Sequence, residues 1–243
     1  ARVGDGNIFV SEVDESDGSI AFFEPRIAVV NNISLDHKSL DELRSLFRGF
    51  IAGAQRVVLN LDNTETAAIS VDLDPKQVVT YSLRSTQAHL LASSPVRSPT
   101  GISSQVKARD TGEVVDAALK VPGLHNVANA LAALSVAKAC GVSLTEAVAH
   151  LAEFSGIRRR LEVVGTANEI TIIDDFAHNP DKISATLETL HAFPGRLLVM
   201  FQPHGYGPIR LMREVLVNCF VRGLHDEDVL VMPEPVYFGG TVD

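Results

Sequence analysis

Two short motifs place polar side chains where the chain is expected to turn into a helix. Residues 174–180 read Asp-Asp-Phe-Ala-His-Asn-Pro, and residues 122–130 read Pro-Gly-Leu-His-Asn-Val-Ala-Asn-Ala. The first backbone N–H groups of a helix have no partner inside it, and the helix dipole is positive at that end. Both motifs therefore favour contact with an anion such as a phosphate.

Two asparagines of the earlier motif share one face of its helix. Asn126 and Asn129 are three positions apart, which places them side by side on a helix surface. A carboxamide can pair with the N6/N7 edge of adenine. The alternative is that Asn126 caps the helix while Asn129 is an ordinary surface residue.

Acidic and amide side chains follow two expected strands near the start of the chain. Residues 11–17 read Ser-Glu-Val-Asp-Glu-Ser-Asp, and residues 31–37 read Asn-Asn-Ile-Ser-Leu-Asp-His. Open parallel sheets bind ligands beyond the carboxyl ends of their strands, and Mg²⁺ prefers hard oxygen ligands. A magnesium site and a solvated acidic turn are both compatible with this pattern.

A basic run and a polar turn complete the candidates. Residues 158–160 are three consecutive arginines, and the arginine guanidinium offers a fork that suits phosphate. A solvated hinge is the alternative. Residues 201–208 read Phe-Gln-Pro-His-Gly-Tyr-Gly-Pro and follow an expected strand, where a ligand would bind in a parallel sheet.

Composition narrows the class of protein. The 243 residues are 46% hydrophobic, as in a globular protein with a substantial core, and carry a net charge of −9. Since no basic stripe exists, we expect no nucleic-acid partner. We see no signal peptide and no apolar run near the length of a membrane span, so we expect a cytoplasmic protein without a membrane partner. Cys140 and Cys219 lie in apolar stretches and are expected to be buried free thiols.

Periodicity predicts an α/β fold in two domains, residues 1–155 and 156–243, with the boundary near Ser155-Gly156. Strands alternating with helices indicate a parallel sheet, and a run of short segments with turn signals between them indicates an antiparallel annex. In the first domain we expect strands at 8–14, 27–33, 56–61 and 78–83, annex segments at 87–92, 102–109 and 113–120, and helices at 39–53, 125–140 and 143–153. In the second we expect strands at 161–166, 169–174, 197–202 and 228–232, and helices at 180–192 and 208–222. Ser143 and Glu146 have the spacing of a capping box.

The motifs at 122–130 and 174–180, with Gly-Ile-Arg-Arg-Arg at 156–160 between them, resemble the Mur ligase family. Its members are ATP-dependent amide ligases that build the peptide of bacterial cell-wall precursors, and the resemblance covers nearly the whole chain. It implies part of a P-loop-type central domain with a parallel sheet, followed by an incomplete Rossmann-like C-terminal domain.

The resemblance also implies roles for individual residues. The cofactors would be ATP and Mg²⁺, with Glu12 and His37 as metal ligands. Five residues would contact the nucleotide. His125, Asn126 and Asn129 would lie around the adenine. Arg160 would contact a phosphate group, and Asp175 would lie near the ribose. The catalytic residues would be His178, His204 and Arg160.

Within the family, the chain is most similar to the branch that joins L-alanine to UDP-N-acetylmuramate, which would be its substrates. The muropeptide-recycling branch is next. No lysine occurs between Lys38 and Lys76, so the carbamylated lysine of other branches is missing. Gly205 and Pro208 stand where the alanine-adding branch has arginines, and Arg210 could partly replace them. The substrate therefore stays open, including acceptors of the folate or cyanophycin type.

The phosphate loop of the family, Gly-x-x-Gly-Lys-[Ser/Thr], does not occur in the chain. The chain begins without Met and stops just after a strand. We therefore expect a fragment that lacks the amino-terminal domain, the phosphate loop and the carboxy-terminal end, and that is inactive alone. A non-catalytic nucleotide-binding remnant is the alternative.

Overall fold

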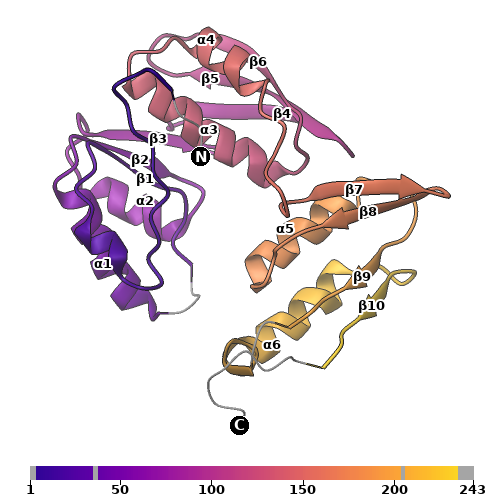
Figure 1. Ribbon diagram of the computed structural model, residues 1–243. Helices are drawn as coiled ribbons and strands as arrows, with labels where there is room; N and C mark the ends of the chain where they lie inside the picture. The colour runs from indigo at the N-terminus through magenta and orange to yellow at the C-terminus, as the bar shows by residue number, and fades with distance from the viewer. Residues whose placement is uncertain (1–3, 35–37, 204–205, 235–243) are drawn as a thin grey trace.

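The computed structural model describes residues 4–34, 38–203 and 206–234. Six strands form one sheet in the order β1-β2-β3-β4-β5-β6 (Figure 1). The first four strands are parallel, and β5 and β6 continue the same sheet as antiparallel strands. The predicted parallel sheet with an antiparallel annex is confirmed. The strands are β1 (Ile27–Val30), β2 (Arg56–Asn60), β3 (Val78–Ser82), β4 (Leu90–Ser98), β5 (Gly101–Ala108) and β6 (Val114–Leu119).

Helices cover both faces of this sheet. Neighbouring residues of a strand point to opposite faces, and in β2 Val58 packs in the core with α3 and α4 while Leu59 packs in the core with α1. Both side chains are fully buried. The helices are α1 (Leu40–Ala52), α2 (Thr64–Val71), α3 (Leu124–Ala139) and α4 (Leu144–Leu151). We refer to β1–β6 with α1–α4 as the sheet region.

The caps of these helices follow from local sequence. Ser39 and Glu42 form a complete capping box at the start of α1. Ser143 accepts a hydrogen bond from the Glu146 N–H at the start of α4, which is one half of the predicted box. Helix α2 was not expected from the sequence, although Asn63 caps it by accepting from the Thr66 N–H.

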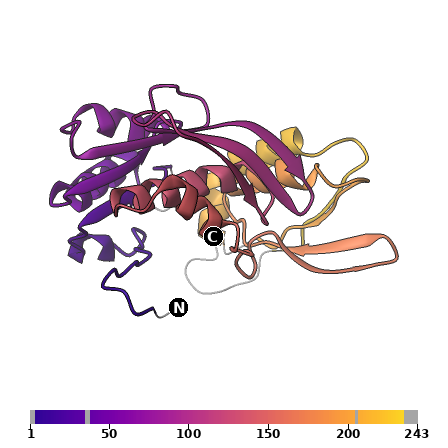
Figure 2. The same cartoon turned by 90° about the horizontal axis from the view of Figure 1, so that it is seen from above.

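The carboxy-terminal region consists of β7–β10 with α5 and α6. Its strands β7 (Glu162–Ala167) and β8 (Ile170–Asp174) form an antiparallel hairpin with no helix between them, seen as an extended ribbon in Figure 2. Strands β9 (Leu198–Met200) and β10 (Val229–Val231) are parallel, and α5 (Pro180–Leu190) and α6 (Tyr206–Gly223) lie on one side of them (Figure 1). Their shared core contains Ile183, Leu187, Leu216, Cys219 and Phe220.

The expected strand at 8–14 is wrong. These residues form no strand, and Phe9 is 90% exposed. A strand needs a hydrogen-bonded neighbour, and β1 at the edge of the sheet pairs only with β2 among the described residues. The apolar sequence predicted burial, but burial depends on a partner that local sequence does not supply.

Two smaller expectations also differ from the structure. The annex segment expected to end at residue 92 continues to Ser98 as β4, with a bulge where the register against β5 shifts between Ser93 and Val96. Both cysteines are free thiols, but Cys140 is exposed at the end of α3 and only Cys219 is buried.

Candidate functional site

A cavity of about 1350 Å³ brings together three of the predicted site residues. Glu12 lies on its wall near the start of the chain, Asn129 faces it from α3, and Arg160 faces it from the segment before β7. The three positions are far apart in sequence and come from both regions. Of the other predicted residues within the described ranges, His125, Asn126, Asp175 and His178 do not line the cavity.

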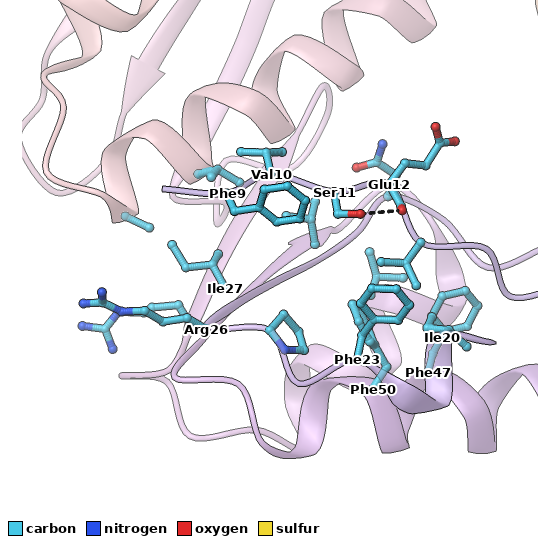
Figure 3. A pocket seen from close by; sticks show the side chains of 18 of the residues that line it. Phe9, Val10, Ser11, Glu12, Ile20, Phe23, Arg26, Ile27, Phe47 and Phe50 are labelled. Atoms are coloured by element: carbon cyan, nitrogen blue, oxygen red, sulfur yellow. Dashed lines mark hydrogen bonds between the residues drawn. The ribbon is translucent and has the colours of Figure 1, made fainter. Parts of the chain in front are cut away.

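One wall of the cavity carries oxygen-bearing side chains. Glu12 is exposed, and Asn31 and Asn32 follow β1 at its carboxyl end. The hydroxyl of Ser11 donates to the backbone oxygen of Glu12 at 2.9 Å (Figure 3). The side-chain carboxylate of Glu12 takes no part in this hydrogen bond. Carboxylate and amide oxygens are hard donors, so this wall suits Mg²⁺. The second predicted ligand, His37, lies outside the described residues.

Other parts of the cavity lining are apolar. Figure 3 shows Phe23, Phe47 and Phe50 gathered near Ile20, with Phe9 and Val10 above Ile27 of β1. Arg26 lies at one edge of this group. The cavity therefore combines a polar side with a surface that can cover an apolar or planar group.

Gly123 explains the geometry at the start of α3. It is the N-cap residue and has a φ of 96°, a conformation that L side chains rarely adopt. A Cβ added there would lie 2.5 Å from His125 Cε1 and 2.6 Å from the Thr189 hydroxyl of α5. The two regions thus approach each other closely over this glycine. The N-cap residue is Gly123, so the alternative in which Asn126 caps the helix is wrong.

His125 lies half-buried at this contact between the regions. Burial lowers the pKa of its imidazole, and the nearby carboxylates of Asp175 and Glu188 act in the opposite direction. The ring therefore favours the neutral form near neutral pH.

The arginine run is arranged around one aromatic ring. The guanidinium carbons of Arg159 and Arg160 lie 5.2 and 5.5 Å from the centre of the Phe176 ring. Arg159 also forms an ion pair with Asp174 at 3.4 Å. Arg160 is the member of the run that lines the cavity, so its guanidinium is the one placed to meet an anion there.

Asp175 connects the first segments of the carboxy-terminal region by hydrogen bonds. One carboxylate oxygen accepts from the Leu161 N–H at 3.0 Å, and the other accepts from the Thr186 hydroxyl at 2.7 Å. These bonds join the end of β8 to the start of β7 and to α5. Each oxygen keeps a further lone pair, so the carboxylate has a structural task and still has acceptor capacity.

His178 is oriented by its own loop. Its Nδ1 lies 2.9 Å from the backbone oxygen of Phe176, and a carbonyl only accepts, so Nδ1 carries the proton. Its Nε2 lies 3.4 Å from the ammonium of Lys182. Asn179 is 4% exposed and caps α5 by accepting from the Lys182 N–H at 3.0 Å. The predicted helix start at this motif is found.

Lys182 is a cavity residue that sequence reasoning missed. Its side chain lines the cavity and contacts His178, one helical turn earlier. The spacing of His and Lys across the start of a predicted helix was the available signal, because it places both on one face.

The turn after β9 is only partly described. His204 and Gly205 lie outside the described residues. Before them, the amide nitrogen of Gln202 donates to the backbone oxygen of Glu234 at 3.4 Å. After them, Tyr206 begins α6, and Arg210 is exposed on that helix.

A second cluster of ionisable side chains lies away from the cavity. His191 Nε2 is 2.9 Å from Asp228, and the rings of His191 and His225 stack at 3.8 Å with 18° between their planes. Stacked imidazoles direct their lone pairs in parallel planes, which does not suit two bonds to one metal ion. Hydrogen bonds lower the pKa of Asp228 to about 2. The largest effect comes from the Leu197 N–H, and smaller effects come from His191 and the His225 N–H. We interpret the cluster as a structural clamp between α5 and β10.

No helix within the described ranges combines the length and the apolar character needed to cross a membrane.

Comparison with known proteins identifies related chains. Residues 2–137 match the family described as Mur ligase middle domain, and residues 159–232 match the Mur ligase glutamate ligase domain. The chain is 38% identical to UDP-N-acetylmuramate–L-alanine ligase of Geotalea uraniireducens over 96% of this chain and 51% of that protein. It is 36% identical to the ligase of the same name from Gloeobacter violaceus over 99% of this chain and 51% of that protein. The chain thus spans about half the length of these relatives.

Solved structures give the same result. The UDP-N-acetylmuramate–alanine ligase of Thermotoga maritima matches with a TM-score of 0.69 and 25% identity, over 90% of this chain and 54% of that one. MurF of Acinetobacter baumannii matches in fold, with a TM-score of 0.73 and 22% identity over 88% of this chain and 48% of that one. Because the middle-domain match alone covers more than half of the sequence, the chain belongs to the Mur ligase family.

Proposed function

We propose that this chain forms part of an ATP-dependent amide ligase that joins L-alanine to UDP-N-acetylmuramate and releases ADP and phosphate. The observation that carries the proposal is the cavity lined by Glu12, Asn129 and Arg160, which unites a carboxylate, a carboxamide and a guanidinium from three segments. The curated relatives named for this reaction are about twice as long as the chain. The activity is therefore proposed for a protein that also contains the segments those relatives carry outside the match.

The chain would divide into two domains with different roles, and the boundary between them would lie near Ser155-Gly156. Residues 1–155 would be the later part of the central, ATP-binding domain, and residues 156–243 would belong to the C-terminal domain. Two observations support this division. The two regions have separate hydrophobic cores, and the two family matches, 2–137 and 159–232, lie on either side of the boundary.

The reaction would proceed by two displacements. The carboxylate of UDP-N-acetylmuramate attacks the γ-phosphorus of ATP, which forms an acyl phosphate and releases ADP. The amino nitrogen of L-alanine then attacks the acyl carbon, and phosphate leaves. In such a reaction the protein contributes mainly by positioning the reactants and neutralising their charge.

The predicted site residues and Lys182 have matching roles in this scheme, and of those named next Asn129, Arg160 and Lys182 line the cavity. Asn129 would hold the adenine, with His125 and Asn126 behind it, and Asp175 would lie near the ribose. Arg160 and Lys182 would neutralise phosphoryl oxygens, because both cationic side chains line the same cavity. His178 and His204 would orient the amino acid and the transferring phosphate.

The donors around Glu12 fit a magnesium ion. The Glu12 carboxylate and the Asn32 carboxamide are exposed on one wall of the cavity, and both offer hard oxygen atoms. His37 is proposed as the second protein ligand. A bound Mg²⁺ would polarise phosphoryl oxygens and offset their charge.

The central test is a ligation assay in a completed protein. We would join the chain to the flanking segments of the Geotalea uraniireducens relative and measure formation of the UDP-N-acetylmuramoyl-alanine product. We expect product in the wild type and a loss of at least about a hundredfold in Glu12→Ala, because the metal would lose its carboxylate ligand. Glu169→Ala, on the exposed β7–β8 turn, is the control and should keep full activity. Wild-type turnover in Glu12→Ala at ordinary magnesium would remove Glu12 from the site.

A second candidate function has a specific observation in its favour. Gly205 and Pro208 replace two arginines that the resemblance leads us to expect, so charge-assisted hydrogen bonds to the substrate would be lost. The acceptor would then be a recycled tripeptide or another amino acid.

A panel of acceptors separates the two candidates. The completed protein would be assayed with L-alanine, L-serine, glycine and the tripeptide, before and after Arg210→Ala. If Arg210 replaces a missing arginine, its loss should raise the KM for UDP-N-acetylmuramate about tenfold to a hundredfold. A strong preference for L-alanine that Arg210→Ala leaves unchanged would contradict both a substituted arginine and a different acceptor.

A further inference from the structure

A chain of side-chain hydrogen bonds connects the interior of the sheet to the start of α3. The Tyr81 hydroxyl donates to Asn31 Oδ1 at 2.9 Å, and Asn31 Nδ2 donates to Asn129 Oδ1 at 3.4 Å. Asn129 Nδ2 donates to Asn126 Oδ1 at 3.4 Å, and Asn126 Nδ2 donates to the backbone oxygen of Pro122 at 2.7 Å. Three carboxamides are thus connected in series, and we call this series the amide relay.

The chemistry at one end fixes the direction of the whole relay. The Pro122 carbonyl only accepts, so Asn126 must turn its nitrogen toward it and its oxygen toward Asn129. Asn129 must then present its nitrogen to Asn126 and its oxygen to Asn31. The same rule turns the Asn31 oxygen toward Tyr81, whose hydroxyl must donate. Each carboxamide therefore has one favoured orientation.

Tyr81 anchors the other end. It lies in β3 and is 1% exposed, so its ring is held by the packed core beneath α3. Burial, with a smaller contribution from the carboxylate of Asp62, raises the pKa of the Tyr81 hydroxyl. The hydroxyl therefore stays protonated at ordinary pH and keeps its role as donor.

The relay leaves the Asn129 carboxamide with one hydrogen-bond acceptor and one hydrogen-bond donor that it does not use. Its oxygen keeps one lone pair and its nitrogen keeps one hydrogen, while the other lone pair and hydrogen are used within the relay. Adenine presents a donor at N6 beside an acceptor at N7, which one acceptor and one donor can match. Guanine presents two acceptors on the same edge, O6 and N7. Asn31 and Asn129 both line the cavity.

We propose that Tyr81 and Asn31 are positioning residues that hold the Asn129 carboxamide in one orientation and so make the site prefer adenine to guanine. This inference rests on the proposed function, in which Asn129 meets the base of ATP. Neither residue needs to touch the nucleotide, because each acts through the orientation of the next carboxamide.

The test compares ATP and GTP binding to the completed protein of the ligation assay and to its variants. Tyr81→Phe removes only the hydroxyl, and we expect ATP to bind about threefold to tenfold more weakly while GTP changes little, since one orienting hydrogen bond is lost. Asn31→Asp should reduce the ATP-to-GTP ratio further, because a carboxylate cannot donate to Asn129 Oδ1 and draws the Asn129 nitrogen toward itself. Gln105→Ala is the control, since it removes an exposed amide that bonds Asp116 in the annex.

A second measurement follows the relay without any nucleotide. In the free ¹⁵N-labelled chain, Tyr81→Phe should shift the side-chain NH₂ signals of Asn31 and Asn129, while Gln105→Ala should leave them in place. Unmoved signals, or an unchanged ATP-to-GTP ratio in both relay variants, would overturn the inference and leave the proposed function standing. A completed wild-type protein that binds neither nucleotide would instead overturn the proposed nucleotide site, and the inference with it.

Discussion

In the sheet region the strands beneath the cavity are covered on both faces, whereas the described part of the carboxy-terminal region covers β9 and β10 on one face only. Leu131 of α3 is 0% exposed, while Leu198 of β9 is 64% exposed. The polar residues differ in the same direction. Asn129 is connected through the amide relay to a buried tyrosine, whereas Arg160 is exposed before β7 and its guanidinium carbon lies 5.5 Å from the centre of the half-exposed Phe176 ring.

This contrast indicates how the two sides of the cavity work. The sheet region supplies a fixed surface, with side chains held by a packed core. The carboxy-terminal region supplies cationic side chains, Arg160 and Lys182, from exposed positions. Its contacts to the sheet region include the exposed ion pair of Arg97 and Glu188 at 2.7 Å, and such pairs contribute little stability.

The largest difference should be seen in core substitutions. Leu131→Ala should lower the free energy of unfolding of the sheet region by roughly 3–5 kcal/mol, because it leaves a cavity in a packed core. Leu198→Ala should change stability by less than about 0.5 kcal/mol, because its side chain is already exposed. Chemical denaturation followed by circular dichroism measures both. Similar losses in the two variants would show that β9 is covered in solution and that the contrast is wrong.

A smaller effect should appear in the clamp of the carboxy-terminal region. The pKa of Asp228 is lowered to about 2. The ionised carboxylate therefore contributes fully to the free energy of unfolding above about pH 4, and this contribution is lost as the pH falls from 4 to 2. Asp228→Asn should remove about 1–2 kcal/mol at neutral pH. In thermal melts between pH 6 and pH 2.5, the melting temperature should fall more steeply with decreasing pH for the wild type than for the variant. Parallel curves would contradict the clamp.

The sequence predicted those features that depend on local pattern. The motifs at 122–130 and 174–180 do open helices, because Gly123 and Asn179 act at the N-caps through their own backbone or side chain. The parallel strands and the annex followed from apolar periodicity. Arg160, Asn129 and Glu12 were predicted separately, and the structure brings them to one cavity.

Features that depend on distant contacts could not be predicted. Residues 8–14 have the composition of a strand but no partner strand within the described chain. The roles of Tyr81 and Asn31 arise from the meeting of β3, the end of β1 and α3, which lie far apart in sequence. Nothing in the neighbouring residues of Tyr81 indicates that its hydroxyl orients a carboxamide of α3.

The most direct test of the central claim, that both regions hold one nucleotide, is a comparison of ATP and adenosine binding to three forms of the completed protein. In Arg160→Ala the account predicts that ATP binds about tenfold or more weakly while adenosine is unchanged, since the guanidinium would contact phosphate alone. In Asn129→Ala both ligands should weaken, because both carry the base. An Arg160→Ala chain that binds ATP as tightly as the wild type would contradict the claim that the two regions share the nucleotide.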